Sequence, residues 1–231
     1  MDVKNKENKF LLISLFALGI YFVGPNMALA GSKGKPTKTN INFKLFPGNY
    51  FTDYDVSASL TGTDNSRAKF TGSISEKALP KKTYMGKMAV PIQSVTEFVA
   101  SNMSFGVATL NSYYSTKVND RRFLGVSEDI TTVTATTKPI PVTAKIGDSG
   151  TIGTYIDKRS FKTSLSWKLE NGFNGKAKLI ILNVTNKPSG VLDNTFKTTY
   201  LIQTNGKRES VELETYNDTV NIRVTLKGKY K

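Results

Sequence analysis

The chain of 231 residues contains no histidine and no cysteine, and each absence removes a group of functions. Imidazole and thiolate side chains are the usual ligands of zinc, haem iron and blue copper, and they carry most nucleophilic and general-base catalysis near neutral pH. We therefore expect no metal and no cofactor. Disulfides are excluded as well, so the domain has to be large enough to be stable through its core.

The stretch Gly147-Asp148-Ser149-Gly150 is how the serine of a chymotrypsin-like protease is usually presented. That serine needs a histidine to take its proton, and this chain has none. Gly, Asp and Ser all favour tight turns, and the motif lies between two strand-like stretches at 141–146 and 151–156. We interpret it as a turn, so the chain is not expected to be a serine protease.

Residues 1–30 have the organisation of a signal peptide. Three lysines precede an apolar run over residues 10–24, and Ala28-Leu29-Ala30 supplies small residues at the positions that a signal peptidase reads. The run is shorter than the ~20 apolar residues of a membrane-spanning helix. The sequence therefore predicts export, with cleavage before Gly31 and release into the periplasm or the extracellular space.

The rest of the chain divides into a short leader and one domain. Residues 31–40 contain Gly, Lys, Thr and Pro without an apolar anchor, which predicts a flexible basic leader. Residues 41–231 alternate apolar and polar side chains with the period of half-buried strands. Pro139-Ile140-Pro141 predicts a soft bend near 138–141 inside this single all-β domain.

The strand pattern is clearest at the C-terminal end. Alternating runs between residues 163 and 227 are separated by turn sequences such as Asn171-Gly172 and Asn205-Gly206, which predict an antiparallel meander of five strands. Residues 178–182 are apolar on both faces, as expected of a central strand. Further strands are expected near 41–46, 54–61, 67–75, 104–110 and 130–137.

One helix is expected among these strands. Ser94-Val95-Thr96-Glu97 has the form of a capping box, and Val95, Phe98, Val99 and Met103 then share one helical face. The predicted fold is an antiparallel β-sandwich or curled open barrel with one short helix and the C-terminal meander.

The charge of the chain is strongly positive, with a net of +14. The predicted signal peptide contributes three lysines against Asp2 and Glu7, so the exported chain would carry +13. Outside the cytoplasm such a field favours anionic polysaccharides or a membrane surface over nucleic acid. Four basic doublets near predicted turns are the candidate anion-binding residues: Lys81, Lys82, Arg121, Arg122, Lys158, Arg159, Lys207 and Arg208.

These observations favour a non-enzymatic, exported protein of a bacterial envelope that acts by binding or assembly. A carboxylate-based enzyme acting on glycans is one alternative, with Asp53 and Asp55 on one strand face and Tyr50 and Tyr54 beside them. A carrier that holds a small ligand inside a β cavity is another.

Overall fold

The computed structural model describes residues 40–100, 105–126, 130–135, 139–217 and 221–231, so the predicted signal peptide and nearly all of the basic leader lie outside the described residues. The described chain is all-β. Its strands are β1 (Phe43–Lys44), β2 (Asp55–Asp64), β3 (Lys69–Ala78), β4 (Lys82–Tyr84), β5 (Lys87–Ala100), β6 (Phe105–Ser115), β7 (Phe123–Val126), β8 (Ile130–Ala135), β9 (Thr143–Ala144), β10 (Ser149–Asp157), β11 (Lys162–Asn171), β12 (Ala177–Asn186), β13 (Leu192–Ile202), β14 (Arg208–Asn217) and β15 (Ile222–Tyr230).

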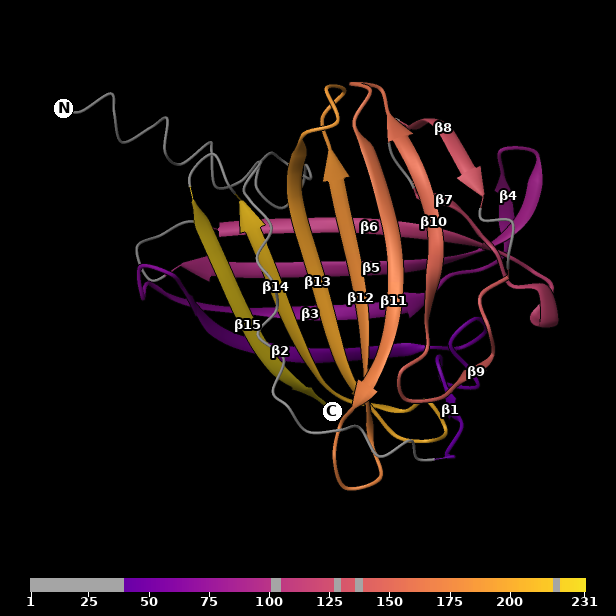
Figure 1. The fold of residues 1–231 in the computed structure, drawn as a ribbon, viewed down its shortest axis with the longest axis horizontal. Helices are drawn as coiled ribbons and strands as arrows, with labels where there is room; N and C mark the ends of the chain where they lie inside the picture. The colour runs from indigo at the N-terminus through magenta and orange to yellow at the C-terminus, as the bar shows by residue number, and fades with distance from the viewer. Residues whose placement is uncertain (1–39, 101–104, 127–129, 136–138, 218–220) are drawn as a thin grey trace.

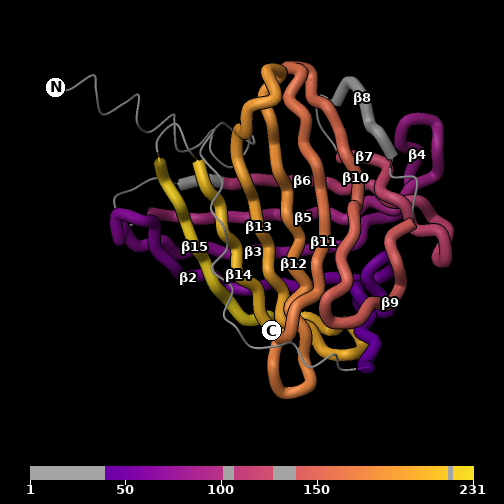
Figure 2. Tube along the Cα trace, viewed as in Figure 1, coloured from indigo at the N-terminus to yellow at the C-terminus, as the bar shows by residue number. Residues whose placement is uncertain are grey.

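Thirteen of these strands form one antiparallel sheet that folds over on itself. The order is β7-β6-β5-β3-β2-β15-β14-β13-β12-β11-β10-β8, with β4 paired to β5, while β1 and β9 form a separate short ladder. The strands from β10 to β15 make one layer, and β2, β3, β5 and β6 make a second layer that crosses behind it (Figures 1 and 2). The sheet passes from one layer to the other where β15 pairs with β2.

The opposite side of the fold is held by packing between β7, β8 and β10. Gly153 of β10 lies directly against the ring of Phe123 in β7, because a Cβ at this glycine would be 2.3 Å from a carbon of that ring. The result is a nearly closed, barrel-like sheet, which agrees with the predicted curled barrel or sandwich.

The inner faces of the two layers share one hydrophobic core. Leu60, Ile74 and Phe98 from one layer pack in the same cluster as Leu169 and Leu226 from the other. Each of these side chains is at most 3% exposed. Burial of apolar surface at about 25 cal/mol per Å² is the main stabilising contribution, which explains how the chain dispenses with disulfides.

The predicted C-terminal meander is confirmed as β11 to β15, each strand pairing with the next. The turns are those that the sequence indicates: Gly190 and Gly206 have φ of 81° and 84°, the left-handed region that glycine adopts without strain. The Gly147-Asp148-Ser149-Gly150 stretch is a turn only in its first half: the Lys145 amide donates to Asp148 Oδ2, and Ser149 and Gly150 already belong to β10, where they pair with β11.

The predicted helix is wrong. Residues 94–100 belong to β5, which pairs with β3 on one side and β6 on the other, while Met103 lies outside the described residues. Thr96 and Phe98 are buried and Glu97 is exposed, which is the alternation of a strand. Two flanking ladders satisfy the backbone of this segment, and they outweigh a local capping sequence. Within the described ranges, the helical structure is one 3-10 turn, Val118–Asp120.

Candidate anion-binding site

The loop between β1 and β2 packs against the β13–β14 turn at one end of the sheet. The Lys44 amide donates to the Thr204 carbonyl at 2.9 Å. A Cβ on Gly206 would lie 2.5 Å from the Phe46 carbonyl oxygen, so glycine at this position serves both the turn and the close approach of the loop. These contacts hold the aromatic segment 46–54 against the hydrophobic core at this end of the sheet.

Arg208, the first residue of β14, points into that end and is only 5% exposed. Its guanidinium carbon lies 3.8 Å from the centre of the Tyr200 ring, 4.7 Å from that of Tyr50 and 5.6 Å from that of Tyr54. Tyrosine rings attract a cation through their electron-rich faces, and more strongly where water is excluded. The arginine is therefore enclosed by one ring from β13 and two from the β1–β2 loop.

Glu76 of β3 is the counter-ion of Arg208. Its carboxylate forms an ion pair with Arg208 Nη1 and is itself 4% exposed. The hydroxyl groups of Tyr200 and Tyr230 each donate to this carboxylate at 3.1 Å. The charged pair is thus both neutralised and hydrogen-bonded, as a buried pair has to be to survive transfer from water.

Burial and the charges of the pair shift the pKa values of Arg208 and of the tyrosines around it. Burial is the largest single influence and lowers the pKa of Arg208, but Glu76 and the neighbouring tyrosines together outweigh it, so the pKa of Arg208 is raised well above its usual value. Burial also raises the pKa of the surrounding tyrosines, that of Tyr114 to about 12. At neutral pH Arg208 is therefore charged and the phenols around it are neutral.

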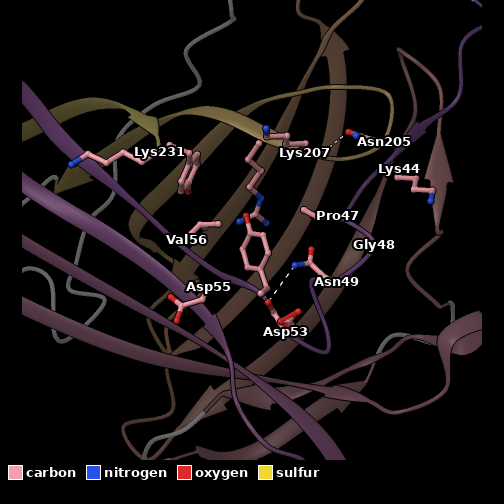
Figure 3. A pocket seen from close by; sticks show the side chains of 13 residues that line it. Lys44, Pro47, Gly48, Asn49, Asp53, Asp55, Val56, Asn205, Lys207 and Lys231 are labelled. Carbon is pink, nitrogen blue, oxygen red and sulfur yellow. Dashed lines mark hydrogen bonds between the residues drawn. The ribbon is translucent and has the colours of Figure 1, made fainter.

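A pocket of about 430 Å³ opens above this cluster (Figure 3). Arg208, Tyr54 and Tyr230 belong to its lining. The remaining lining residues come from the end of β1, the β1–β2 loop, the start of β2, the β13–β14 turn and the last residue described: Lys44, Pro47, Gly48, Asn49, Asp53, Asp55, Val56, Asn205, Lys207 and Lys231.

The charges of the pocket do not balance. Asp55 is paired with Lys77 at 2.9 Å, and Arg208 is paired with Glu76. The remaining side-chain charges of the lining are three lysines, Lys44, Lys207 and Lys231, against Asp53. Arg208 Nε is buried and has no hydrogen-bond partner within the described part of the chain. The exposed lysines above the buried guanidinium suit the site to an anionic group.

The four basic doublets do not gather at this pocket. Lys207 and Arg208 line it, one exposed and one buried. Lys158 and Arg159 lie in the β10–β11 turn, which the antiparallel register of β10 to β14 places at the opposite end of the layer, and Arg159 pairs with Asp157 at 2.7 Å.

The other two doublets lie near one another. Lys82 pairs with β5 in the β4–β5 hairpin, and the backbone of Arg122 bonds to the end of β6 beside that hairpin. Lys81 and Lys82 are exposed. Arg121 is 7% exposed and stacks 4.1 Å above the Phe51 ring, whereas Arg122 pairs with Asp120 at 2.7 Å.

The residues of the glycan alternative separate into two groups. Asp53 and Asp55 are exposed at the pocket rim. Tyr50 and Tyr54 are each 5% exposed, and their rings pack on one another at 4.9 Å. Neither of these two rings presents an open face on which a sugar could stack.

Sequence reasoning missed Glu76, Tyr200 and Tyr230, together with Lys44 and Lys231. A signal for Glu76 is present in β3, since it continues the inward series of Phe70 and Ile74 at alternate positions. A carboxylate at an inward position requires a buried partner. The sequence does not indicate which of its 32 basic residues that partner is.

No group of three or more acidic side chains among the described residues could hold a metal ion. None of the helical structure described is long and apolar enough to cross a bilayer.

No protein-family profile matches the chain, and no curated protein matches it in sequence. A crystal structure of a "putative lipoprotein" from Parabacteroides distasonis aligns with 82% of this chain and 99% of its own, at 11% identity and a TM-score of 0.38.

Removing one member of the buried pair should destabilise the fold strongly. Arg208→Met leaves the Glu76 carboxylate buried without its cation, and we expect the free energy of unfolding to fall by about 3–5 kcal/mol in urea denaturation. Adding Glu76→Leu to Arg208→Met should recover part of that loss. Arg223→Met, which removes an exposed pair with Glu214, is the control and should cost less than about 1 kcal/mol. Equal losses for the two arginine variants would contradict the assignment.

Alkaline pH should also unfold the protein. The pKa of Tyr114 is about 12 in the fold against 10.0 when free, so above pH 10 the unfolded chain releases a proton that the folded chain retains. The contribution of the buried Tyr114 phenol to the free energy of unfolding is therefore fully present below pH 10, and it is lost as the pH rises towards 12. Tyrosinate absorbance and circular dichroism should change together over that interval. Full tyrosine ionisation while the β signal persists would show that the phenols are not buried.

Proposed function

We propose that the protein is a non-enzymatic binding protein, exported to a bacterial envelope, that holds anionic groups of an envelope polymer at the pocket above Arg208. The observation that carries this proposal is the unbalanced positive charge of the pocket, where Lys44, Lys207 and Lys231 surround a guanidinium fixed by Glu76. A guanidinium held in place by Glu76 loses little conformational entropy on binding, and the exposed lysine side chains can adapt to successive anionic groups along a polymer.

Binding is favoured over catalysis by the chemistry of the same residues. The sequence has no histidine or cysteine, and Asp53 and Asp55 are exposed carboxylates at the pocket rim rather than enclosed groups. Among the described residues, the buried carboxylate next to the pocket is that of Glu76. It is already paired with Arg208 and accepts hydrogen bonds from Tyr200 and Tyr230.

The net charge and the export signal support the same proposal. A chain of net +13 attracts polyanions over distances of about 10 Å at moderate salt, and the pocket then gives the local contact. Phosphate and carboxylate groups share the chemistry that the pocket needs. The polymer can therefore be a polyphosphate type such as a teichoic acid or an acidic polysaccharide.

The test is retention on immobilised polyanion. The chain from Gly31 onward, which contains every strand that the structure describes, should bind inorganic polyphosphate or polygalacturonate at low salt and elute as salt rises. Preference for one matrix over the other identifies the anionic group. Exchange of Lys44, Lys207 and Lys231 for Gln should weaken binding about tenfold.

The matched control changes three exposed lysines away from the pocket, Lys69, Lys162 and Lys178, to Gln. It removes the same charge, so any greater loss in the pocket variant belongs to the site. Equal weakening in both variants would reduce the effect to net charge alone. Retention that does not change with salt, or absence of binding to both matrices, would remove the proposal.

A further inference from the structure

The β4–β5 hairpin carries two of the most exposed apolar side chains in the described part of the chain. Met85 is 62% exposed and Met88 is 55% exposed. Lys81, Lys82 and Lys87 are interspersed with them, and residues 79–90 contain no acidic side chain. We refer to residues 81–88 as the hairpin tip. It projects from the end of the back layer (Figures 1 and 2).

The backbone of the hairpin tip makes the presence of Met85 unusual. Met85 and Gly86 form a two-residue turn with φ of 46° and 75°, so both lie in the left-handed region. Asn-Gly is the preferred pair for such a turn, and an unbranched apolar residue at the first position costs free energy. An exposed methionine at this position favours neither the backbone conformation of the turn nor the solubility of the protein. The unfavourable backbone conformation of Met85 therefore points to a role in contact with another surface.

The hairpin tip is fixed to the body of the protein. Tyr84 stacks on Tyr113 of β6 with ring centres 3.9 Å apart and an interplanar angle of 11°, and its hydroxyl donates to the Val126 carbonyl at 2.8 Å. Lys82 lies over the other ring of the stack, 5.3 Å from the centre of Tyr113. Met85 is therefore presented by an anchored hairpin.

A second exposed loop leaves the same end of the sheet. Ala89 of β5 pairs with Lys82 on one side and with Ser115, the last residue of β6, on the other. The β6–β7 loop follows Ser115 directly, and it carries Lys117 and Val118, the latter 68% exposed. Asp120 is the acidic residue of this loop, and Arg122 neutralises it at 2.7 Å.

We propose that the hairpin tip and the β6–β7 loop together dock on the surface of a bilayer that contains anionic lipid. Met85, Met88 and Val118 would enter the boundary between headgroups and acyl chains, while the lysines beside them meet the headgroup phosphates. The apolar tips distinguish a bilayer from a soluble polyanion, which offers nothing apolar to bury. This surface and its partner are separate from the pocket above Arg208.

Vesicle co-sedimentation tests the proposal with the chain from Gly31 onward. Vesicles of phosphatidylcholine and phosphatidylglycerol in equal amounts should bind the protein, and phosphatidylcholine alone should not. Met85→Asn with Met88→Ser should lower the partition coefficient at least about tenfold, although Met85→Asn suits the turn better and should not impair folding. Lys81, Lys82 and Lys87 changed together to Gln should lower it about a hundredfold.

Val99→Ser with Val107→Ser is the matched control, since these valines are 39% and 44% exposed on the outer face of β5 and β6. This variant should bind vesicles like the parent chain. Because the chain contains no cysteine, Met85→Cys also gives a single thiol for an environment-sensitive dye, whose emission should shift to the blue on binding.

Three results would overturn the proposal. The first is equal binding to both kinds of vesicle or to neither. The second is unchanged binding by the Met85→Asn, Met88→Ser variant. The third is that the parent chain binds no vesicles while the variant with Lys81, Lys82 and Lys87 changed to Gln loses retention on polyphosphate. That result would assign this end of the fold to a soluble polyanion. A negative result with vesicles does not bear on the proposed polymer binding at the pocket above Arg208, because that proposal is tested with variants of other residues.

Discussion

A guanidinium and a carboxylate withdrawn from water determine how the end of this fold is built. Arg208 belongs to one layer and Glu76 to the other, and neither can stay buried unless the other is present. The pair therefore fixes how β3 and β14 lie across the core. Tyr200 and Tyr230 complete the hydrogen bonds of the carboxylate, and the rings around the arginine exclude water from the pair.

The same constraint gives the pocket its chemical character. Glu76 neutralises Arg208 from below, while Lys44, Lys207 and Lys231 lie on the open side. An anionic group entering the pocket would meet cations whose positions depend on the fold. The hairpin tip uses another arrangement, with lysines around apolar side chains on an anchored turn. One chain thus combines two cationic surfaces that differ in what accompanies the charge.

Much of the fold was predictable because its signals are local. Alternation and Asn-Gly turns identified the five C-terminal strands, each of which pairs with the next strand along the chain. The helix at Ser94–Met103 was predicted wrongly because β5 owes its conformation to two partners, and its own residues fit either structure. Local patterns say little about a segment whose backbone is satisfied on both sides by distant strands.

The candidate site was only partly predictable for a related reason. Lys207 and Arg208 were selected as a basic doublet, but their roles differ completely, since one is exposed and the other is buried against Glu76, 132 residues away in sequence. Asp53 and Asp55 were selected for their spacing, and they lie at the rim of the same pocket. No local pattern pairs a buried acid with its base, because that pairing depends on how the two layers cross.

Arg208 itself offers the most direct measurement. Its Nε–H should give a resolved signal in nitrogen-15 NMR at neutral pH, since the atom is enclosed and exchanges slowly with water. The account predicts that this signal is protected and that it shifts on titration with inorganic polyphosphate. A rapidly exchanging signal that polyphosphate leaves unchanged would contradict both the enclosed ion pair and the pocket above it.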